Sequence, residues 1–196
     1  MVPPMALPTY PFRAMNEMSH IDDEGHARMV DVGNKSETRR RASSEVYVEL
    51  GQKAYAVLMS EGSPKGDALA VARIAGIQGA KRCSELIPLC HPLALEQIQV
   101  DLEPVPGRHA IRITCEATLS GKTGVEMEAM TGASVAALAL YDMCKALDKG
   151  IRIEGLRLIR KEGGKSGTWV ATEMDSATKP SKTAPGGVAS DSKEGR

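Results

Sequence analysis

Residues 121–150 read GKTGVEMEAMTGASVAALALYDMCKALDKG, and the rest of the chain can be placed around this stretch. The stretch follows a glycine-bracketed turn, contains no proline and ends at a glycine, which is a common helix stop. From Ala129 onward, polar residues recur at steps of three, four and seven against a background of Ala, Val, Leu, Met and Cys. This spacing predicts a mostly buried helix with one polar edge. The polar residues are Thr131, Ser134, Tyr141, Asp142, Lys145, Asp148 and Lys149.

Charged residues near both ends of this helix each have two interpretations. Asp142 and Lys145 lie one turn apart and face the same way, either as a solvated surface pair or as a chemically active pair. Glu126 and Glu128 would point to one side of an extended segment, but they would equally suit the first turn of a helix. The spacing alone leaves both questions open.

The length of 196 residues suits one domain of ordinary size with additional tails. Residues 1–17 contain four prolines and are expected to form a flexible extension. Residues 172–196 are rich in Ser, Thr, Lys, Pro and Gly, which predicts a disordered tail. The single folded domain is therefore expected to span residues 18–171.

Composition argues against several classes of protein. The formal net charge is zero and aromatic residues make up only 3%, which disfavours binding to nucleic acid. No apolar run approaches the length of a membrane span, and no secretory signal is visible. The four cysteines include no C-x-x-C pair, so a zinc ribbon is not expected. Free thiols in a reducing cytoplasm are expected instead.

Hydrophobic periodicity predicts the order strand, helix, strand, strand, helix, strand. The expected elements are a strand at 46–50, a short helix at 52–60, a long helix at 68–87, a hairpin at 98–102 and 111–115, the helix described above, and a last strand at 151–159. Asp67 is the expected N-cap of the first long helix. This order predicts an α+β, ferredoxin-like split βαβ fold, in which an antiparallel sheet carries two long helices on one face.

Two further segments are candidates for binding. Cys90 and His91 lie between two prolines, so the backbone around them is stiff and can hold a functional side chain. His91 could also be purely structural, and no second cluster supplies the ligands that a metal site would need. The run of three arginines at 39–41 is either a solvated basic patch or an anion contact.

Two Gly-Lys dipeptides resemble the end of a phosphate-binding Walker A loop, at Lys122 and Lys165. That loop needs another glycine five positions before its Gly-Lys, where this chain has Glu116 and Ile159, so both matches fail. A weaker expectation remains, because glycines beside Lys161 and Lys165 would let ammonium groups reach a phosphate.

Several specific strings occur together and in one order. They are KGD at 65–67, RIAGIQGAKR at 73–82, LIPLCHPL at 86–93, KTGVEMEAMT at 122–131, ALYDMCKA at 139–146 and KEGGKSG at 161–167. With these strings the chain closely resembles the molybdenum cofactor biosynthesis protein C family, the cyclic pyranopterin monophosphate synthases. The resemblance runs from roughly Ser19 to Trp169 without a long gap.

The resemblance implies a reaction, an assembly and a set of site residues. The family converts a cyclised dihydro-GTP (3',8-cyclo-7,8-dihydroguanosine triphosphate) to cyclic pyranopterin monophosphate and releases pyrophosphate. The implied assembly is a homohexamer, a trimer of dimers, with active sites at a subunit interface. No cofactor is required, although Mg²⁺ can accompany the pyrophosphate. The implied catalytic residues are Lys65, Asp142 and Lys145, and the implied substrate-binding residues are Leu89, Cys90, His91, Glu126, Met127, Glu128, Lys161 and Arg40.

The residue types agree with this chemistry. A triphosphate needs several lysines or arginines to balance its charge. A lysine crowded by other cations has a lowered pKa and can act as an acid or base near neutral pH. Two other readings remain, a non-catalytic ferredoxin-like ligand-binding module and a general phosphohydrolase. Pyrophosphate release separates them, because a binding module gives none and a hydrolase would also release it from GTP.

Overall fold

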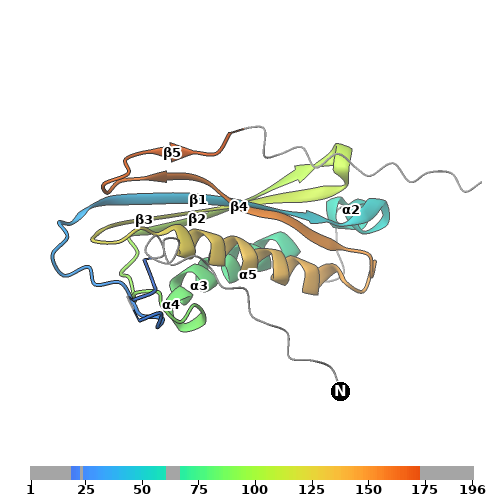
Figure 1. The fold of residues 1–196 in the computed structure, drawn as a ribbon. Coiled ribbons are helices and arrows are strands. Elements are labelled where there is room, and N and C mark those ends of the chain that lie inside the picture. The colour runs from blue at the N-terminus through green and yellow to red at the C-terminus, as the bar shows by residue number, and fades with distance from the viewer. Residues whose placement is uncertain (1–18, 23, 61–66, 173–196) are drawn as a thin grey trace, which may run out of the picture.

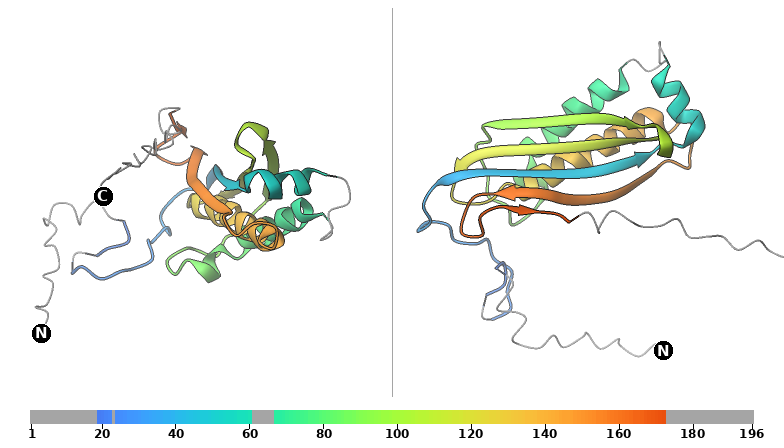
Figure 2. Two further views of the ribbon diagram at one scale, coloured as in Figure 1. Left: turned by 90° about the vertical axis from the view of Figure 1, so that its right-hand side faces the viewer. Right: turned by 90° about the horizontal axis from the view of Figure 1, so that it is seen from above.

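The chain forms one five-stranded antiparallel sheet in the order β2-β3-β1-β4-β5 (Figure 2). The computed structural model describes residues 19–22, 24–60 and 67–172. The strands are β1 (Thr38–Glu49), β2 (Gln97–Val105), β3 (Ala110–Gly121), β4 (Arg152–Glu162) and β5 (Trp169–Val170). The helices are α2 (Gly51–Met59), α3 (Ala68–Lys81), α4 (Cys83–Leu86) and α5 (Glu126–Cys144), with a 3-10 turn at Pro106–Arg108.

Both long helices, α3 and α5, cover the same face of the sheet (Figure 1). The first four strands have the order β2-β3-β1-β4, with the long helix α3 between β1 and β2 and the long helix α5 between β3 and β4, which is the ferredoxin-like arrangement. The predicted α+β fold is therefore confirmed. Asp67 caps α3 as expected, because its side chain accepts a hydrogen bond from the Ala70 N–H at 2.8 Å.

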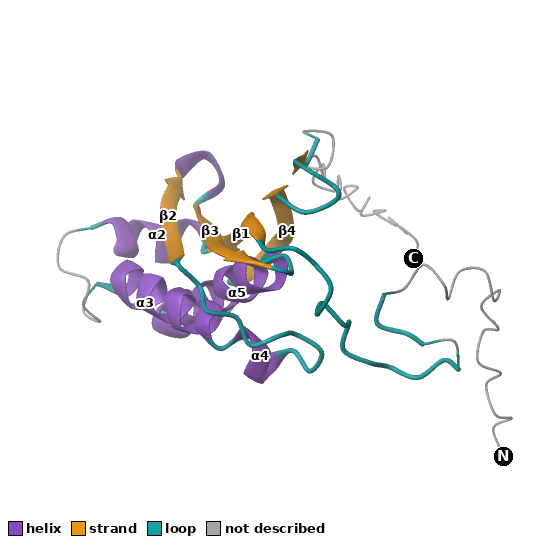
Figure 3. Cartoon of the chain, turned by 90° about the vertical axis from the view of Figure 1, so that its left-hand side faces the viewer, coloured by secondary structure: helices purple, strands orange, loops and turns teal. Residues whose placement is uncertain are grey.

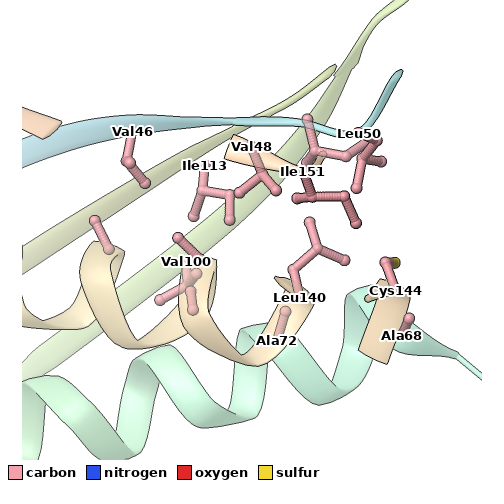
Figure 4. Close-up of a cluster of buried hydrophobic side chains, with 14 of the residues drawn as sticks. Val46, Val48, Leu50, Ala68, Ala72, Val100, Ile113, Leu140, Cys144 and Ile151 are labelled. Atoms are coloured by element: carbon pink, nitrogen blue, oxygen red, sulfur yellow. The ribbon is translucent and has the colours of Figure 1, made fainter. Parts of the chain in front are cut away.

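The core lies between the sheet and the two helices, and it is aliphatic (Figure 4). Val46 and Val48 of β1 point from the sheet toward Leu140 of α5, and all three side chains are fully buried. No aromatic ring belongs to the buried set among the described residues. Shape-matched small side chains must therefore supply the packing that large rings supply elsewhere.

Glycines let α3 and α5 approach closely. A Cβ added to Gly79 would lie 2.7 Å from the Cβ of Val135, and one added to Gly132 would lie 2.5 Å from the Sγ of Cys115. Real side chains do not approach that closely, so these helix positions accept only glycine without rearrangement. The contact rigidly joins the helix that carries the candidate site to the rest of the domain.

The helix-free face of the sheet carries ion pairs. Glu45 of β1 is buried and accepts hydrogen bonds from Arg112 Nε at 2.9 Å and Arg157 Nε at 2.8 Å, on the two neighbouring strands. Each guanidinium also places an Nη2 atom within 2.8 Å of the same carboxylate. These paired contacts tie β3, β1 and β4 together across the face that no helix covers.

The structure corrects three predictions about local structure and decides a fourth that had two alternatives. β1 begins at Thr38 and takes the arginines at 39–41 into the sheet, because β3 pairs with all three and β4 also pairs with Arg41. The expected 68–87 helix breaks at Arg82, and α4 follows. Glu126 and Glu128 lie in the first turn of α5, which decides between the two alternatives. α5 ends at Cys144, six residues before the glycine expected to stop it, with Lys145 as its C-cap.

Some expectations concern residues outside the description. Lys65 lies in the undescribed segment 61–66, and the expected tails at 1–17 and 172–196 lie outside it apart from Thr172. Across the described ranges, no helix combines the length and apolar character needed to cross a membrane.

Candidate functional site

Two adjoining cavities lie at the N-terminal end of α5. The first, about 350 Å³ in volume, is lined by six of the predicted substrate-binding residues, Leu89, Cys90, His91, Glu126, Met127 and Glu128. The second, about 740 Å³, is lined by Lys35, Arg40, Lys122 and Lys165 among others. We call them the acidic cavity and the basic cavity. Lys35, Thr123 and Gly124 line both, so the two cavities share a wall.

The two carboxylates of the acidic cavity have different environments. Glu126 is half-buried, and its Oε1 lies 3.2 Å from the Nζ of Lys161 on β4. Glu128 is only 4% exposed, and burial raises its pKa above the ordinary value of 4.5; the neighbouring charge of Glu126 adds to this, while hydrogen bonds from its own backbone and from Cys83 oppose it. Glu128 is therefore protonated more easily than an ordinary exposed carboxyl, and in the protonated form it can donate as well as accept a hydrogen bond.

The segment between α4 and β2 supplies His91 and Cys90 to the acidic cavity. His91 Nε2 lies 2.9 Å from the carbonyl oxygen of Val30. A carbonyl only accepts, so Nε2 carries the proton and Nδ1 is the acceptor of the neutral ring. Burial raises the pKa of the Cys90 thiol, and it raises that of Cys83 to about 12. Cys90 is thus neutral near pH 7 and contributes shape and weak hydrogen bonding rather than a nucleophilic thiolate.

The basic cavity is built where β1, the turn before α5 and the β4–β5 connection meet. Arg40 donates from Nε to the carbonyl of Gly121 at 3.4 Å and from Nη2 to that of Lys122 at 3.5 Å. Lys122 in turn donates to the Gly33 carbonyl at 2.9 Å. The described lining contains four cations and no carboxylate, which makes this cavity suited to a polyanion.

The β4–β5 connection approaches Arg40 so closely that it requires glycine. Gly163 and Gly164 have φ values of 96° and 71°, in the left-handed region. A Cβ on Gly164 would overlap the Arg40 guanidinium, and a Cβ on Gly163 would overlap the Arg39 carbonyl oxygen. The glycines therefore allow Lys165 and Arg40 to line the same cavity.

Asp142 and Lys145 lie at the other end of α5. Their side chains are 67% and 54% exposed, and Lys145 Nζ lies 2.6 Å from Asp142 Oδ1. The hydrogen bond and charge of Asp142 raise the pKa of Lys145. The 19 residues of α5 span about 28 Å, so one chain does not bring this pair to the cavities.

The predicted site residues thus form two groups. The structure gathers Arg40, Lys161 and the six residues of the acidic cavity at one end of α5, and it leaves Asp142 and Lys145 at the other. Sequence reasoning missed Lys35 and Lys122 as lining residues of the basic cavity. Lys35 lies in a loop without periodicity, and Lys122 had only a failed Walker A match to mark it.

Within the described ranges, no group of three or more His, Cys, Asp and Glu side chains is arranged to hold a metal ion. The acidic cavity offers hydrogen-bond acceptors and the basic cavity offers cations. The pair can therefore bind a ligand that combines a polar ring system with phosphates.

The fold and this pair of cavities define a ferredoxin-like α+β protein with a composite polar ligand site. A family model described as the MoaC family matches residues 29–164. A protein of Novosphingobium aromaticivorans described as cyclic pyranopterin monophosphate synthase is 54% identical over 159 residues, which cover 81% of this chain and 100% of that relative. The chain belongs to the MoaC family.

Proposed function

We propose that this protein is a cyclic pyranopterin monophosphate synthase that acts in molybdenum cofactor biosynthesis. It converts the cyclised dihydro-GTP to the cyclic phosphate and expels pyrophosphate, which makes it a phosphorus–oxygen lyase. Family membership and the 54% identical relative support the reaction. The structural observation that carries it is the shared wall between an acidic and a basic cavity, which matches a guanine-derived ring joined to a triphosphate.

In this proposal each cavity has one task. Lys35, Arg40, Lys122 and Lys165 bind the triphosphate and stabilise the charge that develops on the departing pyrophosphate. Glu126 and Glu128 accept hydrogen bonds from the N–H groups of the guanine-derived ring. Lys161 holds Glu126 in place through their ion pair. Leu89, Cys90, His91 and Met127 complete the walls that shape the ring's position.

The catalytic group must then come from a second chain. Asp142 and Lys145 lie about 24 Å and about 28 Å along α5 from Glu126, too far to act on a ligand in the cavities of the same chain. We therefore assign the active site to an interface, where the cavities of one subunit meet the Asp142 and Lys145 of its neighbour. A homohexamer built as a trimer of dimers, as the family resemblance implies, would repeat this interface by symmetry.

Mixing two inactive variants tests the shared site. Lys145→Ala damages only the far end of α5, and Glu126→Gln damages only the cavity end. Each variant alone should be nearly inactive on the cyclised dihydro-GTP, because a positioned proton-transfer group contributes typically about 10²–10⁴ in rate. After the variants are unfolded together and reassembled, about a quarter of the sites would combine two intact halves, so activity should reappear. No recovery, with each parent folded and assembled, would refute the shared site.

Substrate choice tests the reaction itself. The wild-type protein should release pyrophosphate from the cyclised dihydro-GTP and form the pterin, and it should leave GTP intact. Release from GTP would indicate a phosphohydrolase. Binding without release would indicate a ligand-binding module.

We further propose that the reaction needs no resident cofactor and that any Mg²⁺ accompanies the pyrophosphate. The four thiols are free, which supports a cytoplasmic setting. Dialysis against a chelator should leave pterin formation intact, with product formation followed by fluorescence. Loss of turnover that only added metal restores would contradict this proposal.

A further inference from the structure

The segment that precedes β1 folds into a small hairpin beside the acidic cavity. Ile21 and Ala27 form an antiparallel bridge, and the Arg28 N–H donates to the His20 carbonyl at 2.8 Å. The side chain of Asp22 fastens the turn by accepting from the His26 N–H at 2.8 Å. Two residues after Arg28, the carbonyl oxygen of Val30 contacts His91, which connects the segment to the acidic cavity.

His20, at the start of this hairpin, lines the acidic cavity together with Cys90, Glu126 and Glu128. Its Nδ1 lies 3.3 Å from the Arg28 carbonyl oxygen. Because that oxygen only accepts, Nδ1 carries the proton and Nε2 is the acceptor of the neutral ring. Within the described part of the chain, no donor lies at hydrogen-bond distance from Nε2.

The hairpin therefore sets the tautomer of a cavity-lining imidazole and leaves its other nitrogen for a ligand. A phosphate oxygen is itself an acceptor and would repel the lone pair on Nε2. The N–H groups of a guanine-derived ring are donors and would match it. The phosphates have the cations of the basic cavity instead.

We propose that His20 is a substrate-contacting residue, whose Nε2 accepts a hydrogen bond from an N–H of the guanine-derived ring. This inference rests on the proposed function. It assigns the hairpin at residues 20–28 a direct part in recognising the substrate ring, in addition to Glu126 and Glu128 on α5.

Two substitutions of His20 distinguish a contact with the substrate from a role in holding the hairpin together. His20→Asn keeps an amide near the place of Nδ1, so it can still donate to the Arg28 carbonyl, but it cannot reach as far as Nε2. His20→Gln places its amide nearer to Nε2 and gives up the Arg28 contact. His26→Asn is the matched control, because His26 lies on the same hairpin with an exposed side chain and does not line the cavity.

We expect kcat/KM for the cyclised dihydro-GTP to fall about tenfold or more in His20→Asn, because a donor of the substrate ring loses its acceptor in the cavity. His20→Gln should retain several times more activity than His20→Asn, and His26→Asn should match wild type. Circular dichroism on all three variants checks that each is folded.

Equal losses in both His20 variants, or a greater loss in His20→Gln, would assign His20 to holding the hairpin and overturn the contact. Wild-type activity in His20→Asn would also overturn it, with the proposed function unaffected. A folded wild-type protein that releases no pyrophosphate from this substrate would refute the proposed function and, with it, the contact that depends on it.

Discussion

Glu128 is a single residue whose burial opposes its own ionisation. Its carboxyl is 4% exposed and lies beside Glu126, and burial is the main reason that its pKa is raised. A carboxyl with a raised folded-state pKa contributes most to stability below its unfolded value of about 4.5, and that contribution is lost as pH rises through the folded pKa. The folded protein therefore tolerates the charge at neutral pH at the expense of stability.

We expect Glu128→Gln to melt at a higher temperature than wild type at pH 7 and to show little difference below pH 4.5, because glutamine cannot ionise. Turnover should fall at the same time, since the carboxylate is lost from the acidic cavity. Thermal melts across this pH range, paired with kinetics, provide the measurement. Glu126→Gln is the control, because it removes half of an ion pair with Lys161 and gains nothing at pH 7. An unchanged or lower melting temperature for Glu128→Gln at pH 7 would contradict this account.

Alanine substitutions at Gly164 and Gly167 distinguish the effect of backbone strain from the effect of contact with Arg40. Both have positive φ, 71° and 63°, so alanine at either costs about 1–2 kcal/mol of stability. Only the Cβ at Gly164 would overlap Arg40, because a Cβ at Gly167 meets nothing within 4 Å. Gly164→Ala should therefore raise KM for the substrate well above that of Gly167→Ala, while the two lose similar stability. Matching KM values would show that Arg40 does not depend on Gly164 for its place.

At the scale of elements, the contact between α3 and α5 explains a glycine that helix propensity disfavours. Gly132 lies in the middle of α5, where glycine costs about 1 kcal/mol relative to alanine. An alanine Cβ would lie 2.5 Å from Cys115 Sγ and 3.2 Å from both Ala80 Cβ and the Gly76 carbonyl oxygen. Overpacking of this kind typically costs about 1–3 kcal/mol, which exceeds the gain in propensity.

Gly132→Ala should accordingly lower the free energy of unfolding despite its better helix propensity. Cys115→Ala should also be destabilising, because it leaves a small void under α5. In the double variant the new methyl group occupies the space that the sulfur vacated. The double variant should therefore lose less stability than the sum of the losses in the two single variants. Urea unfolding of the four proteins gives the coupling. Strict additivity would show that the sulfur is not what excludes alanine.

The sequence predicted elements well where one side of the element is buried. Val46 and Val48 alternate with polar residues, and Asp67 stands directly before an apolar run, so that strand and that helix start could be recognised. It failed at the arginines of 39–41, because their place in β1 depends on partners more than 70 residues away in β3. It also failed at Arg82, where nothing but the local backbone marks the break between α3 and α4.

The site was harder to predict than the fold. The resemblance supplied the residues of the acidic cavity, and they do come together. The predicted helix already placed Asp142 and Lys145 near its other end, and the structure shows them there. Lys35 and His20 belong to irregular segments, whose place beside the cavities is set by contacts such as the His91–Val30 hydrogen bond. Such contacts leave no periodic pattern in a sequence.

At the scale of the whole molecule, the two long helices leave apolar side chains open to solvent. Ile74 on α3 is 61% exposed and Leu138 on α5 is 59% exposed, although their helices are otherwise well packed. Subunit contact would bury such side chains, and the interface site proposed above would place a neighbour against this molecule.

We expect light scattering at micromolar concentration to give six times the mass of one chain. A chain shortened to residues 17–174 should assemble and turn over like the full chain, because the removed residues lie outside the 29–164 family match. A monomer with full activity would remove the reason for a shared site. A shortened chain that assembles but loses turnover would show that a terminal segment takes part in the reaction.

The position of Trp169 gives the protein a built-in optical reporter. It is the only tryptophan in the chain and is 43% exposed. It lies on β5 and pairs with Lys161 on β4. Figure 3 shows that the connection between β4 and β5 lies away from the helix layer, so the indole emission reports on this edge and on the loop that carries Lys165. Fluorescence can thus follow occupation of the basic cavity without a label. By the same placement it is a poor monitor of unfolding, because detachment of a two-residue edge strand would change the emission before the aliphatic core opens.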